Sequence, residues 1–134
     1  MNSLKKEERL CNIKLIEKLY HSGSSFLVYP FRIIWHSSEA ISEFPVQILI
    51  SVPKKKFKRA VDRNLLKRRI REIYRTQKAE NLFPFLNERS EKIVLGINYI
   101  GNEIAEYVSM EKKFNTAMLR LKKNISEQTC SKSL

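Results

Sequence analysis

The alternation of apolar and polar residues along the chain predicts six elements in the order helix, strand, strand, helix, strand, helix. The first is a helix over 12–22, because Ile16, Leu19 and Tyr20 recur at helical spacing. Gly23 is placed to end it.

Three stretches rich in β-branched and aromatic residues predict strands. We interpret 26–36 as one strand in which Pro30 marks an edge or an irregularity. A second strand covers 45–52 and ends at Pro53. The third, 92–100, is nearly continuous in apolar residues, which indicates a strand buried on both faces.

Two longer helices complete the pattern. One follows a basic loop and extends from about Asp62, a natural N-cap, to about Lys78. The other covers about 103–123, and the tail from about 126 to 134 is predicted to fray. The apolar stripe of this last helix consists of Tyr107, Met110, Phe114, Met118, Leu121 and Ile125.

This order of elements is typical of a small α+β domain, a two-layer sandwich in which helices pack on a sheet. The 134 residues correspond to a single domain, 1–134, which we expect to be ordered over about 5–124.

Composition excludes several classes of protein. The sequence has no apolar run long enough to span a membrane, and its charged N-terminus is not a signal peptide. Two cysteines, Cys11 and Cys130, give neither a disulfide framework nor a metal-ligand spacing, which favours a cytoplasmic protein. Three glycines and the absence of a phosphate-binding motif make a nucleotide-dependent enzyme improbable.

The charge is concentrated in one segment. The chain has a net charge of +12, and twelve of its 26 Lys and Arg fall within 54–78, beside only two acids, Asp62 and Glu72. Because so many like charges repel one another, we expect this segment to bind a polyanion, nucleic acid first and an anionic membrane surface second.

A helical projection of this segment separates two faces. Leu66, Ile70 and Ile73 cluster on one side, with Tyr74 at its edge. The other side is polar and almost entirely cationic, and consists of Asn64, Lys67, Arg68, Arg71, Arg75 and Lys78. Together with the preceding loop it predicts a nucleic-acid-binding surface made of Lys54, Lys55, Lys56, Lys58, Arg59, Arg63, Asn64, Lys67, Arg68, Arg71 and Arg75. A merely solvated face or a membrane-binding helix are the alternatives, and charge alone does not separate DNA from RNA.

The run SVPKKKFKRAVDRNLLKRRIREIYR resembles the signature of the bacterial ribonuclease P protein component. That family has paired lysines after a strand, then Ala-Val, Arg-Asn-Arg, Lys-Arg and a further Arg at helical spacing. The matching residues here are Lys54, Lys55, Ala60, Val61, Arg63, Asn64, Lys67, Arg68 and Arg71. The resemblance covers about residues 5–124.

Three positions depart from the family pattern. Leu65 replaces the second arginine of Arg-Asn-Arg, which puts one RNA contact in doubt. Pro53 stands where a small polar residue is frequent, and Ile16 where an aromatic is usual.

The resemblance implies an α+β sandwich of the type also found in the second domain of ribosomal protein S5, with a left-handed crossover between two parallel strands through the basic helix. It implies a ribonucleoprotein: a catalytic RNA is the partner, precursor tRNA is the substrate, and the holoenzyme is an endoribonuclease that hydrolyses the 5′ leader. Mg²⁺ would be held mainly by the RNA and the substrate. No membrane or small-molecule substrate is implied.

The residues themselves show no carboxylate cluster suited to metal-dependent nuclease chemistry. We therefore expect no catalytic residue and no metal site in this chain. The resemblance implies a leader-binding cleft between the sheet and the first helix, for which the candidates are Ile16, Tyr20, Phe31, Ile34 and Trp35. Each is also a candidate core residue, because a strand register shifted by one position inverts the face. A ribosomal or RNA-chaperone protein and a self-standing nuclease are the competing functions.

Overall fold

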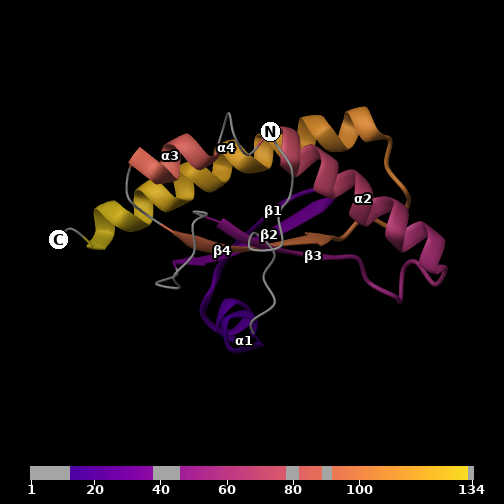
Figure 1. Ribbon diagram of the computed structural model, residues 1–134, viewed down its shortest axis with the longest axis horizontal. Helices are drawn as coiled ribbons and strands as arrows, with labels where there is room; N and C mark the ends of the chain where they lie inside the picture. The colour runs from indigo at the N-terminus through magenta and orange to yellow at the C-terminus, as the bar shows by residue number, and fades with distance from the viewer. Residues whose placement is uncertain (1–12, 38–45, 78–81, 89–91, 133–134) are drawn as a thin grey trace.

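The computed structural model describes residues 13–37, 46–77, 82–88 and 92–132, which form one sheet with helices on both faces (Figure 1). The elements are α1 (Ile13–Ser22), β1 (Ser24–Val28), β2 (Phe31–Ser37), β3 (Val46–Ser51), α2 (Ala60–Gln77), α3 (Phe83–Glu88), β4 (Ile93–Tyr99) and α4 (Tyr107–Lys132). The strand order is β1-β2-β4-β3. β4 pairs with β2 in the antiparallel sense and with β3 in the parallel sense, so α2 and α3 lie in a parallel crossover.

The predicted strand over 26–36 is two strands instead of one. The chain turns at Tyr29 and Pro30, which are joined by a cis peptide bond, and β1 and β2 form an antiparallel hairpin. Aromatic and β-branched residues favour extended backbone equally in one strand or two. The single Pro30 was therefore the only local signal of the turn.

The helix ends also differ from the prediction. α2 begins at Ala60, so Asp62 is not the N-cap but lies in the first turn, where its carboxylate complements the helix dipole. α4 begins at Tyr107 and continues to Lys132, so the tail that was predicted to fray is helical up to that residue. The short helix α3 was not predicted.

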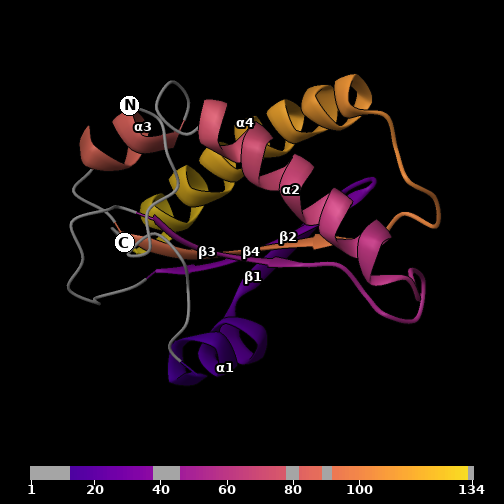
Figure 2. The same cartoon turned by 45° about the vertical axis from the view of Figure 1, so that its right-hand side comes forward.

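The main core lies between the sheet and the helices α2, α3 and α4, which cover one face (Figures 1 and 2). The predicted apolar faces of α2 and α4 are confirmed. Their buried side chains are Leu66, Ile70, Ile73 and Tyr74 on α2, and Met110, Phe114, Met118, Leu121 and Ile125 on α4. These side chains fix both helices on the sheet, with the outer face of α2 directed away from it.

Among the described elements, α1 is the one that covers the other face of the sheet, through a small cluster of Leu19, Ile34 and Val94. Two glycines allow this close contact. A Cβ on Gly96 of β4 would lie 2.7 Å from Ile34 Cγ2, and one on Gly23 would lie 2.3 Å from the carbonyl oxygen of Leu19. Gly23 directly follows the last residue of α1, as predicted, and its position leaves no space for a side chain.

We expect Ile70→Ala to lower the free energy of unfolding by about 2–5 kcal/mol, because Ile70 is fully buried and its truncation leaves a cavity. Chemical denaturation measures the change. Leu119→Ala is the control, since Leu119 is 53% exposed on α4 and should change stability by less than about 0.5 kcal/mol. Equal effects of both substitutions would contradict the assignment of the α2 faces.

Candidate nucleic-acid interface

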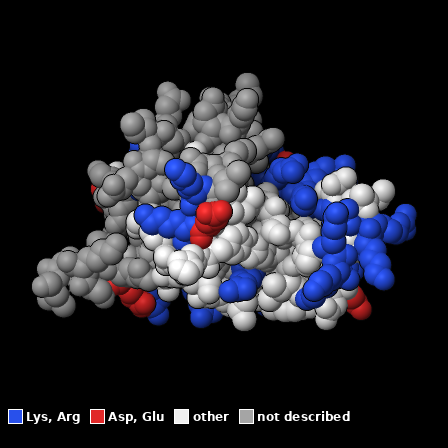
Figure 3. Space-filling model, turned by 90° about the horizontal axis from the view of Figure 1, so that it is seen from below, with Lys and Arg blue, Asp and Glu red and all other residues white. Residues whose placement is uncertain are grey.

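A basic surface lies where β3 leads into α2. The side chains of Lys54, Lys55, Lys56, Lys58 and Arg59 are all exposed. Seen from the α1 side, Lys and Arg gather at the end of the molecule where this loop and the start of α2 lie (Figure 3). The predicted cations of the loop are thus together on one surface.

Contacts with buried and backbone groups hold this loop in place. Phe57 is buried in the main core. The ammonium of Lys56 donates to the carbonyl oxygen of Ile100 at 2.6 Å, and Nη1 of Arg63 donates to the carbonyl oxygens of Phe57 and Lys58 at 2.8 and 2.9 Å. The cations of the loop are therefore presented on a fixed backbone.

The outer face of α2 continues this surface along the helix. Asn64, Arg68 and Arg71 are exposed and Lys67 is half-buried, as the helical projection predicted. Together with Val61 and Leu65 they line a hollow of about 470 Å³. Lys78, the last residue of the predicted face, lies outside the described residues.

Two further cations of α2, besides Arg63, are engaged within the protein. Arg75 forms an ion pair with Glu72, in which Nε donates to Oε2 at 3.2 Å. Hydrogen bonding to Arg75 lowers the pKa of the Glu72 carboxyl, and the same hydrogen bond raises the pKa of Arg75. Arg69 donates to the carbonyl oxygen of Ala105 at 2.8 Å and so ties α2 to the segment before α4. Arg75 is thus partly neutralised, unlike Arg68 and Arg71.

A row of side chains crosses the α1 face of the sheet beyond the small α1 cluster. The strand register aligns Leu27 with Arg32, Arg32 with Asn98, and Asn98 with Ser51. Leu27 is 57% exposed and Arg32 is exposed, whereas Asn98 and Ser51 are half-buried. This row, called the open row below, ends beside the basic loop, because Pro53 and the lysines follow Ser51 closely in sequence.

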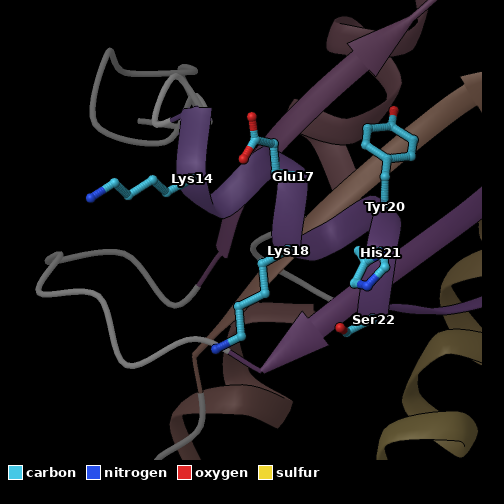
Figure 4. A pocket seen from close by; sticks show the side chains of 6 residues that line it. All are labelled: Lys14, Glu17, Lys18, Tyr20, His21 and Ser22. Carbon is cyan, nitrogen blue, oxygen red and sulfur yellow. The ribbon is translucent and has the colours of Figure 1, made fainter.

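The predicted cleft residues Tyr20 and Ile16 lie on α1 beside this row. The hydroxyl of Tyr20 donates to Oδ1 of Asn98 at 3.2 Å, and the side chain remains 47% exposed. Ile16 is half-buried against the small cluster. Tyr20 projects from α1 over the neighbouring strands, whereas Lys14 points to the other side (Figure 4). The ring is thus available as a platform at the edge of the open row.

The other three predicted cleft residues are buried and do not line it. Phe31 and Trp35 belong to the main core on the opposite face, where Trp35 Nε1 donates to Oδ1 of Asn124 at 2.9 Å. Ile34 is on the α1 face, but α1 covers it and leaves it 4% exposed. The alternative given for each of these three, that it is a core residue, therefore holds, and the register of β2 decides which face each one occupies.

The open row adds two candidates that the sequence did not reveal, Arg32 and Asn98. Single polar residues in apolar strands carry no motif, and only the register brings these two together. Within the described part of the chain, no group of three or more His, Cys, Asp or Glu could hold a metal ion. None of the described helices is long and apolar enough to cross a membrane.

Comparison with known proteins gives a consistent result. Residues 4–122 match the family model for ribonuclease P. The chain is 31% identical over 122 residues to the ribonuclease P protein component of Porphyromonas gingivalis, covering 91% of this chain and 88% of that protein.

Two solved structures share the fold. The ribonuclease P protein of Thermotoga maritima superposes with a TM-score of 0.67 at 19% identity, covering 84% of this chain and 96% of the other. The ribonuclease P protein of Staphylococcus aureus gives a TM-score of 0.63 at 21% identity, covering 85% and 94%. The predicted α+β sandwich is confirmed, and its sheet is of mixed direction.

We expect Arg63→Ala to loosen the basic loop in the free protein, because each hydrogen bond removed is worth about 1 kcal/mol, or about fivefold in local opening. Hydrogen exchange of the backbone amides in 54–59 measures this opening. Lys55→Ala, an exposed loop cation, is the control and should leave exchange unchanged. Unaltered exchange in Arg63→Ala would show that its guanidinium does not hold the loop.

Proposed function

The chain belongs to the bacterial ribonuclease P protein family, and from this premise we propose that it binds the catalytic RNA through the basic loop and α2, and the 5′ leader of precursor tRNA along the open row. It is the protein subunit of ribonuclease P, the endoribonuclease holoenzyme that matures the 5′ end of tRNA.

The observation that carries the first part is a cationic surface on a fixed backbone. Phosphate groups attract Lys and Arg without reading sequence, and a loop backbone that is already held loses less entropy on binding. Lys54, Lys55 and Lys58 extend from the held loop, and Lys67, Arg68 and Arg71 continue the surface along α2. The structured RNA subunit fits this surface because it presents many phosphates in fixed positions.

The second part follows from the chemistry of the open row. Single-stranded RNA binds to surfaces that combine cations with aromatic platforms. Tyr20 supplies a half-exposed ring, Arg32 supplies a cation, and Asn98 supplies an amide whose orientation Tyr20 fixes. The row leads to the basic loop, so a leader lying along it would remain close to RNA bound by α2.

Our proposal assigns binding to this chain and the chemistry to the RNA. Mg²⁺ held by the RNA and the substrate would supply the hydrolytic chemistry, and the described residues of this chain do not have the clustered ligands for such an ion. The protein would act in the bacterial cytoplasm, where precursor tRNA is processed.

We expect the combined variant Lys67→Ala, Arg68→Ala, Arg71→Ala to bind ribonuclease P RNA more weakly and with a smaller salt dependence. The slope of log affinity against log salt should fall by about 0.7–0.9 for each phosphate that the variant no longer binds. Filter binding across a salt series measures it, and leader release at low Mg²⁺ by the reconstituted holoenzyme measures activity.

The unmodified chain should stimulate cleavage only in the presence of the RNA, whereas protein alone should be inactive. The matched control is Lys112→Ala, Lys113→Ala, Lys123→Ala, which removes three exposed cations of α4. If both triple variants change the slope equally, the binding surface is not on α2. No stimulation by the folded unmodified protein would instead favour a ribosomal or RNA-chaperone role.

We expect Tyr20→Ala to weaken binding of precursor tRNA to the holoenzyme by about 5- to 150-fold, since a base–aromatic stack is worth about 1–3 kcal/mol. Arg32→Ala should also weaken binding, because it removes a cation from the open row. A substrate with a single leader nucleotide should bind all variants alike. Val108→Ala, 59% exposed on α4, is the control. Equal reductions for the long and short leaders would refute the assignment of the leader to the open row.

A further inference from the structure

Two apolar side chains, Val61 and Leu65, lie beside the cations of α2. Binding of phosphates by those cations would not require an apolar pair there. Val61 is 67% exposed, and Leu65, one helical turn later, is half-buried. Both lie on the outer side of α2, away from the buried Leu66 and Ile70. They lie at one edge of the cationic arc that our proposed function assigns to RNA.

The two side chains line the 470 Å³ hollow together with four polar or charged side chains. Asn64 and Lys67 lie on one side, and Arg68 and Arg71 continue along the helix. The hollow therefore combines an apolar surface, an amide that can both donate and accept, and several cations. This is the chemistry of a nucleotide: an apolar base face, a polar base edge and flanking phosphates.

Other occupants fit this surface less well. A second copy of the chain would bring its own cationic α2 against this one, and the charges would repel. A membrane would require a broader apolar face than two side chains. A purely ionic contact with duplex phosphates would leave Val61 and Leu65 without a partner, because paired and stacked bases do not present their faces.

We propose that Val61 and Leu65 pack against one unstacked nucleobase of the ribonuclease P RNA, with Arg68 and Arg71 on the adjacent phosphates and Asn64 at the base edge. This inference rests on the proposed function, because it specifies how α2 contacts the catalytic RNA. The RNA element must be a bulge, loop or junction, since only there is a base free of its neighbours.

The family resemblance makes Leu65 informative, because an arginine is usual at that position. An arginine would add a phosphate contact and its salt dependence, whereas leucine adds an apolar contact that salt does not screen. This chain would therefore bind its RNA with one fewer ionic contact and one more apolar contact at this position. The two kinds of contact are separable by experiment.

The test measures affinity of the full-length protein for its ribonuclease P RNA across a salt series. We expect Leu65→Ala to weaken binding by about 5- to 20-fold, because it removes apolar area that the base would cover, with the salt slope unchanged. Leu65→Arg should steepen the slope by about 0.7–0.9. Leu119→Ala, an exposed leucine on α4, is the matched control and should bind as the unmodified protein does.

Chemical probing of the RNA provides a second readout that names the base. Dimethyl sulfate modifies unpaired bases, and one adenine or cytosine protected by the unmodified protein should become reactive with Leu65→Ala but stay protected with Leu119→Ala. Unfolding curves of Leu65→Ala check that the variant is folded, and Leu65→Met should restore both affinity and protection.

The outcomes separate this inference from the proposed function. If the Lys67, Arg68 and Arg71 variant fails to bind while Leu65→Ala binds with unchanged affinity and protection, the surface on α2 stands and the nucleobase site is overturned. If neither variant changes binding, both are overturned. Weaker binding by Leu65→Ala that comes with a reduced salt slope would also overturn the site, because it would indicate a shift of the ionic contacts.

Discussion

The central position of β4 is the constraint on which both surfaces of the protein depend. It pairs with β2 on one side and β3 on the other, so its alternating side chains fix the register of both faces. Ile93, Leu95 and Ile97 enter the main core, whereas Gly96 and Asn98 face α1. If the register of β4 shifted by one residue, its core side chains would face α1 and the open row would be lost.

The two faces of the sheet are covered unequally, and this leaves one of them available. Edge-to-face contacts of Phe31 with Tyr99 and with Phe114, at 6.1 and 5.6 Å between ring centroids, join the sheet to α4 on the core side. On the opposite face the short α1 buries only a small cluster around Leu19 and Ile34. The large core therefore supplies the stability, and α1 can leave Arg32 and Asn98 uncovered without loss of the fold.

An element or surface could be predicted when the residues that indicate it are close together in the sequence. The faces of α2 and α4 were predicted because a period of 3.6 over several turns is written in adjacent residues. The hairpin was missed because Pro30 was its one local signal, and the faces of Phe31 and Trp35 could not be assigned without the register that the hairpin sets. The open row was beyond local reasoning, since its members come from four strands and meet only through register. The basic surface was predicted because a run of Lys and Arg can be recognised in the sequence without knowing how the strands pair.

Charge counting nevertheless overstates how many cations reach a partner. Lys56 and Arg63 donate hydrogen bonds to backbone carbonyls, Arg69 holds the segment before α4, and Arg75 is paired with Glu72. These groups remain charged and add to the field that attracts RNA, but moving any of them to a phosphate would break an existing contact. The net charge of the segment therefore sets the strength of attraction, whereas the side chains that are not held, such as Arg68 and Arg71, set the number of ionic contacts. The remaining affinity must come from contacts that salt does not weaken, and the apolar pair on α2 and the tyrosine at the open row are the groups placed to make them.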